Sequence, residues 1–227
     1  MKVQFVWFDL GLTLLENNHV EIYQKILRDM GYEESQKDIA AAYHLANKYF
    51  MRERPGILGK GKTTEYPQKL FELLGDPFDE EKWEKSIKQH PLREAVWKKF
   101  PFTDQVLQTL HHQGIQTGLI SNWDLSCRSV LKENGLIEQL NPIIISSEVG
   151  IEKPDRKIFE LALERSGISP ENCLYVGDNY YDDVKGASQL GIRTLLINPS
   201  QRFGIEELDY PYVISDIREV ERYIVDI

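Results

Sequence analysis

The sequence predicts an α/β protein built on a doubly wound parallel sheet, with a second, all-helical part inserted near its start. From about residue 99 onward, short apolar runs alternate with amphipathic stretches, as strands and helices do in such a sheet. The runs are rich in Val, Ile and Leu without strict polar alternation, which favours strands covered on both faces. Between the first run and Pro101 only helical spacing is found.

Six apolar runs are the predicted strands. They cover residues 3–8, 115–120, 142–146, 173–177, 193–198 and, more briefly, 212–214. The intervening stretches carry helix boundary signals: SPE at residues 169–171 is typical of a helix start, and Gly135, Gly167 and Gly191 follow predicted helix ends. This order predicts repeated strand and helix units joined by right-handed connections.

The inserted segment is expected to hold about four helices. Its apolar residues recur at helical spacing over residues 22–30, 39–50, 70–74 and 83–87. Ser35, with Asp38 three positions later, resembles a capping box at the second of these helices. We therefore assign residues 1–15 and 96–227 to the sheet domain and residues 16–95 to a helical cap.

Composition and charge narrow the class of protein. The chain has 227 residues, of which 41% are hydrophobic, enough for a sizeable core. Its formal net charge of -9 argues against general binding to nucleic acid or to an anionic membrane, because both need a surplus of Lys and Arg. Cys127 and Cys173 lie in apolar patterns that suit buried thiols, and no run is long enough to span a bilayer. We expect a soluble cytoplasmic protein.

Polar residues gather after the predicted strands. Asp9 follows the first run, Ser121 and Asn122 follow the second, Lys153 lies in the loop after the third, and Asp178 follows the fourth. Ligands of open parallel sheets bind beyond the carboxyl ends of the strands, so these side chains are expected to meet at one edge. Neighbouring carboxylates repel unless a cation joins them, and Mg²⁺ is the natural partner for oxygen ligands.

Each of these residues also has a simpler interpretation. Asp9 is a common type of turn residue after a strand. Ser121 and Asn122 suit a helix cap for a segment starting near Asp124, and Lys153 suits a solvated loop. The acidic residues Asp178, Asp182 and Asp183 suit the start of a helix, where they complement its dipole. Their joint order after successive strands is what favours a functional site.

Four stretches in this order resemble the motifs of the haloacid dehalogenase superfamily, and in particular its branch with an α-helical cap inserted after the first motif. They are DLGLT, LISNW, GIEKPD and VGDNYYDDVKGA. The resemblance covers essentially the whole chain, and the last two motifs are the most specific. It implies a Rossmann-like core, Mg²⁺ as cofactor, and phosphatase activity on a small phosphorylated metabolite.

The resemblance also implies roles for individual residues. Asp9 would be the nucleophile that forms an aspartyl-phosphate, and Thr13 would order the first loop. Ser121, with the backbone of Asn122, would bind the transferring phosphoryl group, and Lys153 would neutralise its charge. The implied metal site comprises Asp9, the Gly11 backbone carbonyl, Asp178 and Asp183, the last through a bound water and with Asp182 as a substitute.

Gly11 departs from the pattern of the family. Phosphatases of this superfamily usually place a second aspartate there, which protonates the leaving oxygen and then activates water. Loss of such general acid/base help typically costs on the order of 100- to 10,000-fold, so slow turnover or another proton donor is expected. Glu16 and His19 start the cap, and we interpret His19 as a surface residue near a helix start.

Two alternatives remain open on the sequence. A dehalogenase would use Asp9 to attack carbon and would lack the metal aspartate of the fourth motif, which this chain retains as Asp178. A non-catalytic module that binds a phosphorylated ligand or a protein is favoured by Gly11 alone. The basic loop over residues 52–66, with Arg52, Arg54, Lys60 and Lys62, suits either an ordinary connector or a grip on an anionic substrate.

Overall fold

The chain folds as two compact units in a computed structural model that describes residues 2–55 and 64–224. The core unit comprises Met1–Glu16, Lys98–Arg202 and Glu206–Ile227. The cap unit comprises Asn17–Trp97 together with Phe203–Ile205. A short ribbon of two strands, β2 (Leu15–Asn17) and β3 (Trp97–Lys99), lies where the chain passes from one unit to the other and back.

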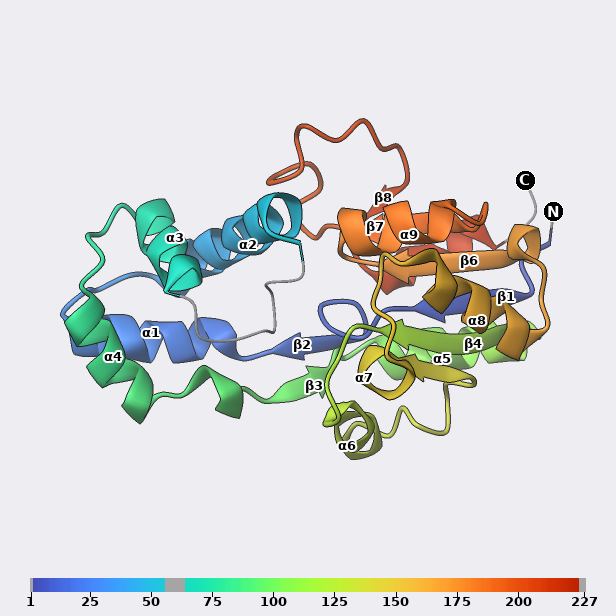
Figure 1. The fold of residues 1–227 in the computed structure, drawn as a ribbon, viewed down its shortest axis with the longest axis horizontal. Helices are drawn as coiled ribbons and strands as arrows, with labels where there is room; N and C mark the ends of the chain where they lie inside the picture. The colour runs from blue at the N-terminus through green and yellow to red at the C-terminus, as the bar shows by residue number, and fades with distance from the viewer. Residues whose placement is uncertain (1, 56–63, 225–227) are drawn as a thin grey trace. The chain divides into compact units, whose positions relative to one another are not determined.

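The core unit is built on a parallel sheet of six strands in the order β5-β4-β1-β6-β7-β8 (Figure 1). The strands are β1 (Phe5–Phe8), β4 (Gln116–Ser121), β5 (Ile143–Ile145), β6 (Cys173–Gly177), β7 (Arg193–Ile197) and β8 (Val213–Ile214). Each of the six predicted apolar runs coincides with one of them, β4 extending one residue beyond its run, and every pairing is parallel. The predicted doubly wound α/β fold is therefore confirmed.

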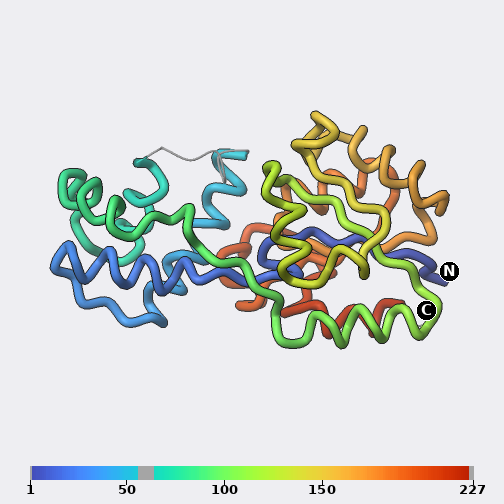
Figure 2. The backbone as a smooth tube through the Cα atoms, turned by 90° about the horizontal axis from the view of Figure 1, so that it is seen from below, coloured from blue at the N-terminus to red at the C-terminus, as the bar shows by residue number. Residues whose placement is uncertain are grey.

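Helices cover both faces of this sheet, which explains why its strands are apolar throughout. α8 (Arg156–Ser166) and α9 (Lys185–Ser188) pack together on one face, whereas α5 (Thr103–His112) and the 3₁₀ helix η4 (Ile217–Tyr223) contact each other on the opposite side (Figure 2). All four residues of β1 are fully buried between these layers. Removal of such apolar surface from water is the main force that holds the layers together.

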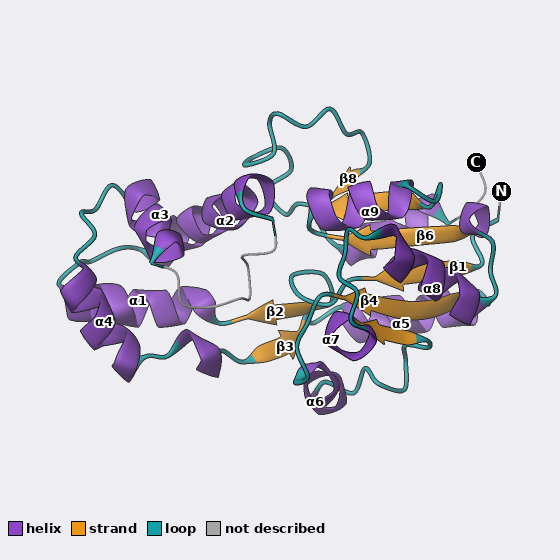
Figure 3. Cartoon of the chain, viewed as in Figure 1, coloured by secondary structure: helices purple, strands orange, loops and turns teal. Residues whose placement is uncertain are grey.

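The cap unit contains the four predicted helices, drawn in purple in Figure 3. They are α1 (His19–Met30), α2 (Gln36–Glu53), α3 (Glu65–Leu74) and α4 (Glu80–Gln89). Their apolar faces form one cluster around Tyr23, Phe71 and Trp83. The predicted cap of α2 is present, because the Ser35 side chain accepts a hydrogen bond of 3.1 Å from the backbone N–H of Asp38.

Local structure differs from the prediction at residues 169–171. The expected helix is a single 3₁₀ turn, η2 (Pro170–Asn172), because the extended backbone of Cys173 begins β6 directly after it. The shorter helices α6 (Cys127–Glu133) and α7 (Ser146–Val149) and the 3₁₀ turn η1 (Leu92–Glu94) are the other short helical elements.

Both cysteines are free and buried, as expected. None of the helices within the described residues is long and apolar enough to cross a membrane.

Candidate active site

Three adjacent strands bring the predicted site residues to one edge of the sheet. Asp9 follows β1, Ser121 ends β4, and Asp178 follows β6, the strands that flank β1 being β4 and β6. The backbone N–H of Asp9 donates to the Val176 carbonyl at 2.9 Å, which continues the sheet by one residue and fixes where the carboxylate lies. All three residues are almost inaccessible to water, with Asp9 the most exposed at 9%.

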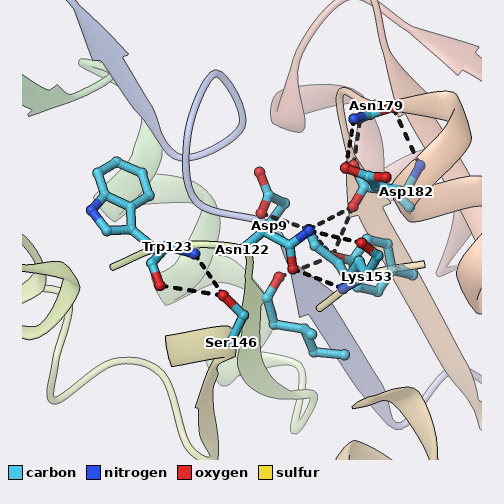
Figure 4. A network of polar contacts seen from close by, with 10 residues as sticks. Asp9, Asn122, Trp123, Ser146, Lys153, Asn179 and Asp182 are labelled. Carbon is cyan, nitrogen blue, oxygen red and sulfur yellow. Dashed lines mark hydrogen bonds and ion pairs between the residues drawn. The ribbon is translucent and has the colours of Figure 1, made fainter. Parts of the chain in front are cut away.

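The Lys153 ammonium group lies between the carboxylates of Asp9 and Asp183 and binds both. Its Nζ donates to Asp9 Oδ1 at 2.7 Å (Figure 4). It also donates to Asp183 Oδ1 at 2.7 Å and to the Tyr175 hydroxyl at 3.0 Å. Burial alone would lower the pKa of Lys153, but the negative charges of Asp183 and Asp9 outweigh it and hold the pKa well above its usual value. Lys153 is therefore a fixed positive charge and not a solvated loop lysine.

The backbone of Lys153 is held by Asn122. The amide of Asn122 donates from Nδ2 to the Lys153 carbonyl at 2.9 Å and accepts from the Lys153 N–H at 2.8 Å. This pair of bonds ties the loop after β4 to the loop that carries Lys153. The Asn122 side chain thus positions the loop that carries Lys153. Ser126, not Asn122, precedes α6, so the helix cap interpretation of Asn122 is wrong.

Asp183 is placed by a single π-helical turn, η3 (Tyr180–Val184). Asn179 begins this turn, and its side chain accepts hydrogen bonds from the N–H groups of Tyr181 and Asp182. The widened turn directs Asp183 inward, where Oδ2 accepts from the Asn179 N–H at 3.0 Å and the side chain is fully buried. Asp182 remains partly accessible and accepts from the Asn179 amide at 2.9 Å.

Three carboxylates of this edge converge closely enough to share a cation. Asp9, Asp178 and Asp183 each offer an oxygen, and these atoms lie within 4.8 Å of one another. Burial raises the pKa of Asp9, and the nearby Asp183 charge adds to this effect against the attraction of Lys153. Carboxylate oxygens gathered in this way are the donor set of a hard divalent ion such as Mg²⁺.

The loop between β1 and β2 carries the other predicted residues. Thr13 is 1% exposed, and its hydroxyl has no hydrogen-bond partner among the residues that the structure describes. Gly11 forms an isolated bridge with Leu15, and the positive φ of this turn belongs to Leu12, at 56°. Gly11 is thus not in the left-handed region that favours glycine.

His19 and the described part of the basic loop belong to the cap unit. His19 is half-buried rather than a plain surface residue, because its Nδ1 lies 2.9 Å from the Tyr43 hydroxyl and aromatic rings surround it, whereas Glu16 is exposed. Most of the basic loop, residues 56–63 with Lys60 and Lys62, lies outside the described residues. Arg52 pairs with Glu53 at 2.7 Å.

Tyr175 is the site residue that sequence reasoning missed. It stands in the middle of β6, where its side chain is buried and its hydroxyl contacts Lys153. The signal was available, because a hydroxyl in an otherwise apolar strand needs a polar partner. The fourth motif begins at Val176, so Tyr175 lies just outside it.

Comparison with known proteins assigns the chain to a family. The family model of haloacid dehalogenase-like hydrolases matches residues 6–197. The chain belongs to the haloacid dehalogenase-like hydrolases. Among the curated members, the glyceraldehyde 3-phosphate phosphatase of Methanothermobacter thermautotrophicus is 32% identical over 231 residues, which cover 96% of this chain and 87% of that protein.

Solved structures of haloacid dehalogenase-like hydrolases share the fold. A phosphatase of this family from Thermococcus onnurineus aligns with a TM-score of 0.58 and 24% identity, covering 99% of this chain and 98% of the other. The L-2-haloacid dehalogenase from Xanthobacter autotrophicus gives a TM-score of 0.58 at 16% identity, with 98% of both chains covered. Because phosphatase and dehalogenase fit the fold equally well, the reaction has to be argued from the site.

Proposed function

We propose that the protein is a Mg²⁺-dependent phosphatase that acts on a small phosphomonoester through an aspartyl-phosphate at Asp9. The observation that carries this proposal is the 2.7 Å ion pair between Lys153 Nζ and Asp9 Oδ1 in a nearly closed site. A fixed ammonium beside the nucleophile opposes the negative charge of an incoming phosphoryl group. Phosphoryl transfer depends chiefly on such preorganised electrostatics.

The reaction would proceed in two displacements at phosphorus. A carboxylate oxygen of Asp9 would attack phosphorus, the bond from phosphorus to the ester oxygen would break, and the departing oxygen would take a proton from solvent and leave as the alcohol. Water then attacks the phosphorus of the acyl phosphate, which releases inorganic phosphate and restores the carboxylate. Ser121 and the backbone of Asn122 would hold the phosphoryl oxygens during both steps, with Lys153 countering their charge.

The convergent oxygens of Asp9, Asp178 and Asp183 support Mg²⁺ as the cofactor, with the Gly11 carbonyl as a further ligand. Mg²⁺ bound there would offset charge on the phosphoryl oxygens. Asp183 already accepts hydrogen bonds at both carboxylate oxygens, from Lys153 and from the Asn179 N–H, which suits a role through bound water.

Gly11 supports a second candidate, a non-catalytic module that binds a phosphorylated ligand on the same site. The glycine supplies no acid for the leaving alcohol and no base for the attacking water. Dehalogenation is less well supported, because Asp178 adds a third carboxylate to the group around Asp9.

A panel of small phosphomonoesters tests the proposal. Glyceraldehyde 3-phosphate, phosphoserine and an aryl phosphate are incubated with the protein, with and without Mg²⁺, and inorganic phosphate is measured. We expect Mg²⁺-dependent release that Asp9→Asn abolishes. Asp124→Asn is the matched control, because Asp124 is an exposed carboxylate that bonds to Ser126 in the loop after β4. Binding of the esters without phosphate release would favour the binding module, and retained activity in Asp9→Asn would remove Asp9 as nucleophile.

A further inference from the structure

We infer that Tyr175 is a positioning residue of the site, whose hydroxyl fixes the orientation of the Lys153 ammonium group toward Asp9. This inference rests on the proposed function for its effect on turnover. Its structural part, the immobilised ammonium group, can be measured whether or not the protein is a phosphatase.

The ammonium group of Lys153 has three protons, and three acceptors surround it. They are Asp9 Oδ1 at 2.7 Å, Asp183 Oδ1 at 2.7 Å and the Tyr175 oxygen at 3.0 Å. A saturated ammonium cannot turn about its last bond without breaking a hydrogen bond in a site from which water is nearly excluded. The Tyr175 oxygen, the uncharged acceptor of the three, therefore holds the ammonium group at the one rotation in which its other two N–H bonds point at Asp9 and Asp183.

The Tyr175 hydroxyl presents a lone pair to Lys153 because its single proton is needed elsewhere. Two acceptors compete for that proton, the Ile120 carbonyl at 3.1 Å and Asp183 Oδ1 at 3.1 Å. Whichever of them receives it, the lone pairs of the phenol oxygen remain for the ammonium group. The hydroxyl thus links the end of β4 and the π-helical turn to the lysine.

The ring of Tyr175 is held as firmly as its hydroxyl. It lies in the apolar layer between the sheet and α8, where it meets the Phe159 ring edge to face at a centroid distance of 5.6 Å. Its exposed fraction is 0%. The phenol oxygen is therefore set by the rigid sheet and not by a loop, which is what positioning of a catalytic charge requires.

The experiment compares Tyr175→Phe with Tyr210→Phe. Tyr210 is a matched control, because its hydroxyl donates to a backbone carbonyl of the same sheet, that of Thr194 at 2.6 Å, without contact to Lys153. In protein labelled with ¹⁵N-lysine, the Lys153 ammonium should give a slowly exchanging ¹H–¹⁵N signal, assigned by its absence in Lys153→Arg. We expect Tyr175→Phe to speed its proton exchange at least about tenfold and Tyr210→Phe to leave it unchanged.

Turnover provides the second measurement. Tyr175→Phe should lower kcat about 10- to 100-fold with KM changed less than about threefold, as for other residues that orient a catalytic group, whereas Tyr210→Phe should retain both. An unaltered ammonium signal in Tyr175→Phe, or no slowly exchanging signal in the wild type, would overturn the inference. If the wild type releases no phosphate from any ester, the proposed function fails while the ammonium signal still decides the role of Tyr175.

Discussion

Gly177 and Asp183 fit so closely that a side chain at position 177 would occupy the space of the carboxylate. A Cβ atom at Gly177 would lie 2.2 Å from Asp183 Oδ2 and 2.5 Å from its Cγ. Asp183 has no room to withdraw, because Lys153 and the Asn179 N–H hold its two oxygens. The glycine at the end of β6 is therefore a requirement of the site and not of the strand.

Gly177→Ala should displace Asp183 and lower phosphatase activity at least about 100-fold, with a loss of about 1–3 kcal/mol in the free energy of unfolding. Phosphate release and urea unfolding would be measured together. Gly167→Ala serves as the control, because the residue has a φ of 68° at the end of α8 and open space around it. That variant should lose about 1 kcal/mol through backbone strain yet keep its activity. Full activity in Gly177→Ala would show that the carboxylate position is unimportant.

Under the proposed function Mg²⁺ would bind the folded carboxylates and not the unfolded chain, so it should stabilise the fold. At 100 times its dissociation constant the gain is about 2.7 kcal/mol, equivalent to roughly 5–10 °C in Tm for a chain of this size. Calorimetric scans with and without Mg²⁺ measure the shift. Asp178→Ala should remove most of it, while Asp155→Ala, at the start of α8, should not. An equal shift in Asp178→Ala and wild type would place the metal elsewhere.

Without divalent ions, Asp182 should make the protein less stable as the pH rises from about 4 to about 6. Burial raises the pKa of Asp182 from 3.8 to about 6, and the charges of Asp183 and Asp9 add to this against the attraction of Lys153. The folded state therefore binds more protons than the unfolded state in this window, so its stability falls with increasing pH. A shift of about two units corresponds to an upper value of roughly 3 kcal/mol.

Asp182→Asn removes this titration, and the difference between the two proteins is the observable. Urea unfolding in EDTA at several values between pH 3.5 and pH 7 would be compared, since other carboxylates titrate in the same range in both proteins. The variant should gain stability relative to wild type as the pH rises. A constant difference across the window would contradict the raised pKa.

Gly11 predicts a dependence of rate on the leaving group. Without a carboxylate to protonate the departing oxygen, aryl or acyl phosphates should react faster than alkyl phosphates, with a burst of leaving group before slow hydrolysis of the aspartyl-phosphate. Gly11→Asp should increase alkyl ester turnover by about 100-fold or more, because it restores the missing carboxylate and the positive φ of this turn lies at Leu12 and not at position 11. Equal rates for both esters, no burst and no gain in the variant would mean that another residue supplies the proton.

The order and type of the strands were predictable because a parallel sheet covered on both faces demands apolar runs of strand length. The six predicted runs match β1, β4, β5, β6, β7 and β8 in chain order. The convergence of Asp9, Lys153 and Asp178 followed from the same rule, since parallel strands end at a common edge. The π-helical turn at Tyr180–Val184 was not predictable, because it depends on the fit between Gly177 and Asp183 rather than on local propensity. The bonds from Asn122 to Lys153 join residues far apart in the chain, and such pairing leaves no periodic signal.

β1 occupies the centre of the sheet although the ribosome makes it first. Its partners β4 and β6 begin at Gln116 and Cys173, so about a hundred residues, including the whole of α1 to α4, are synthesised before β1 can pair. At typical elongation rates of about 5–20 residues per second, the apolar segment FVWF waits roughly 5–20 s with both strand edges open. During that interval the two unpaired edges of this apolar segment are open to strands of other chains, which is the exposure that favours aggregation.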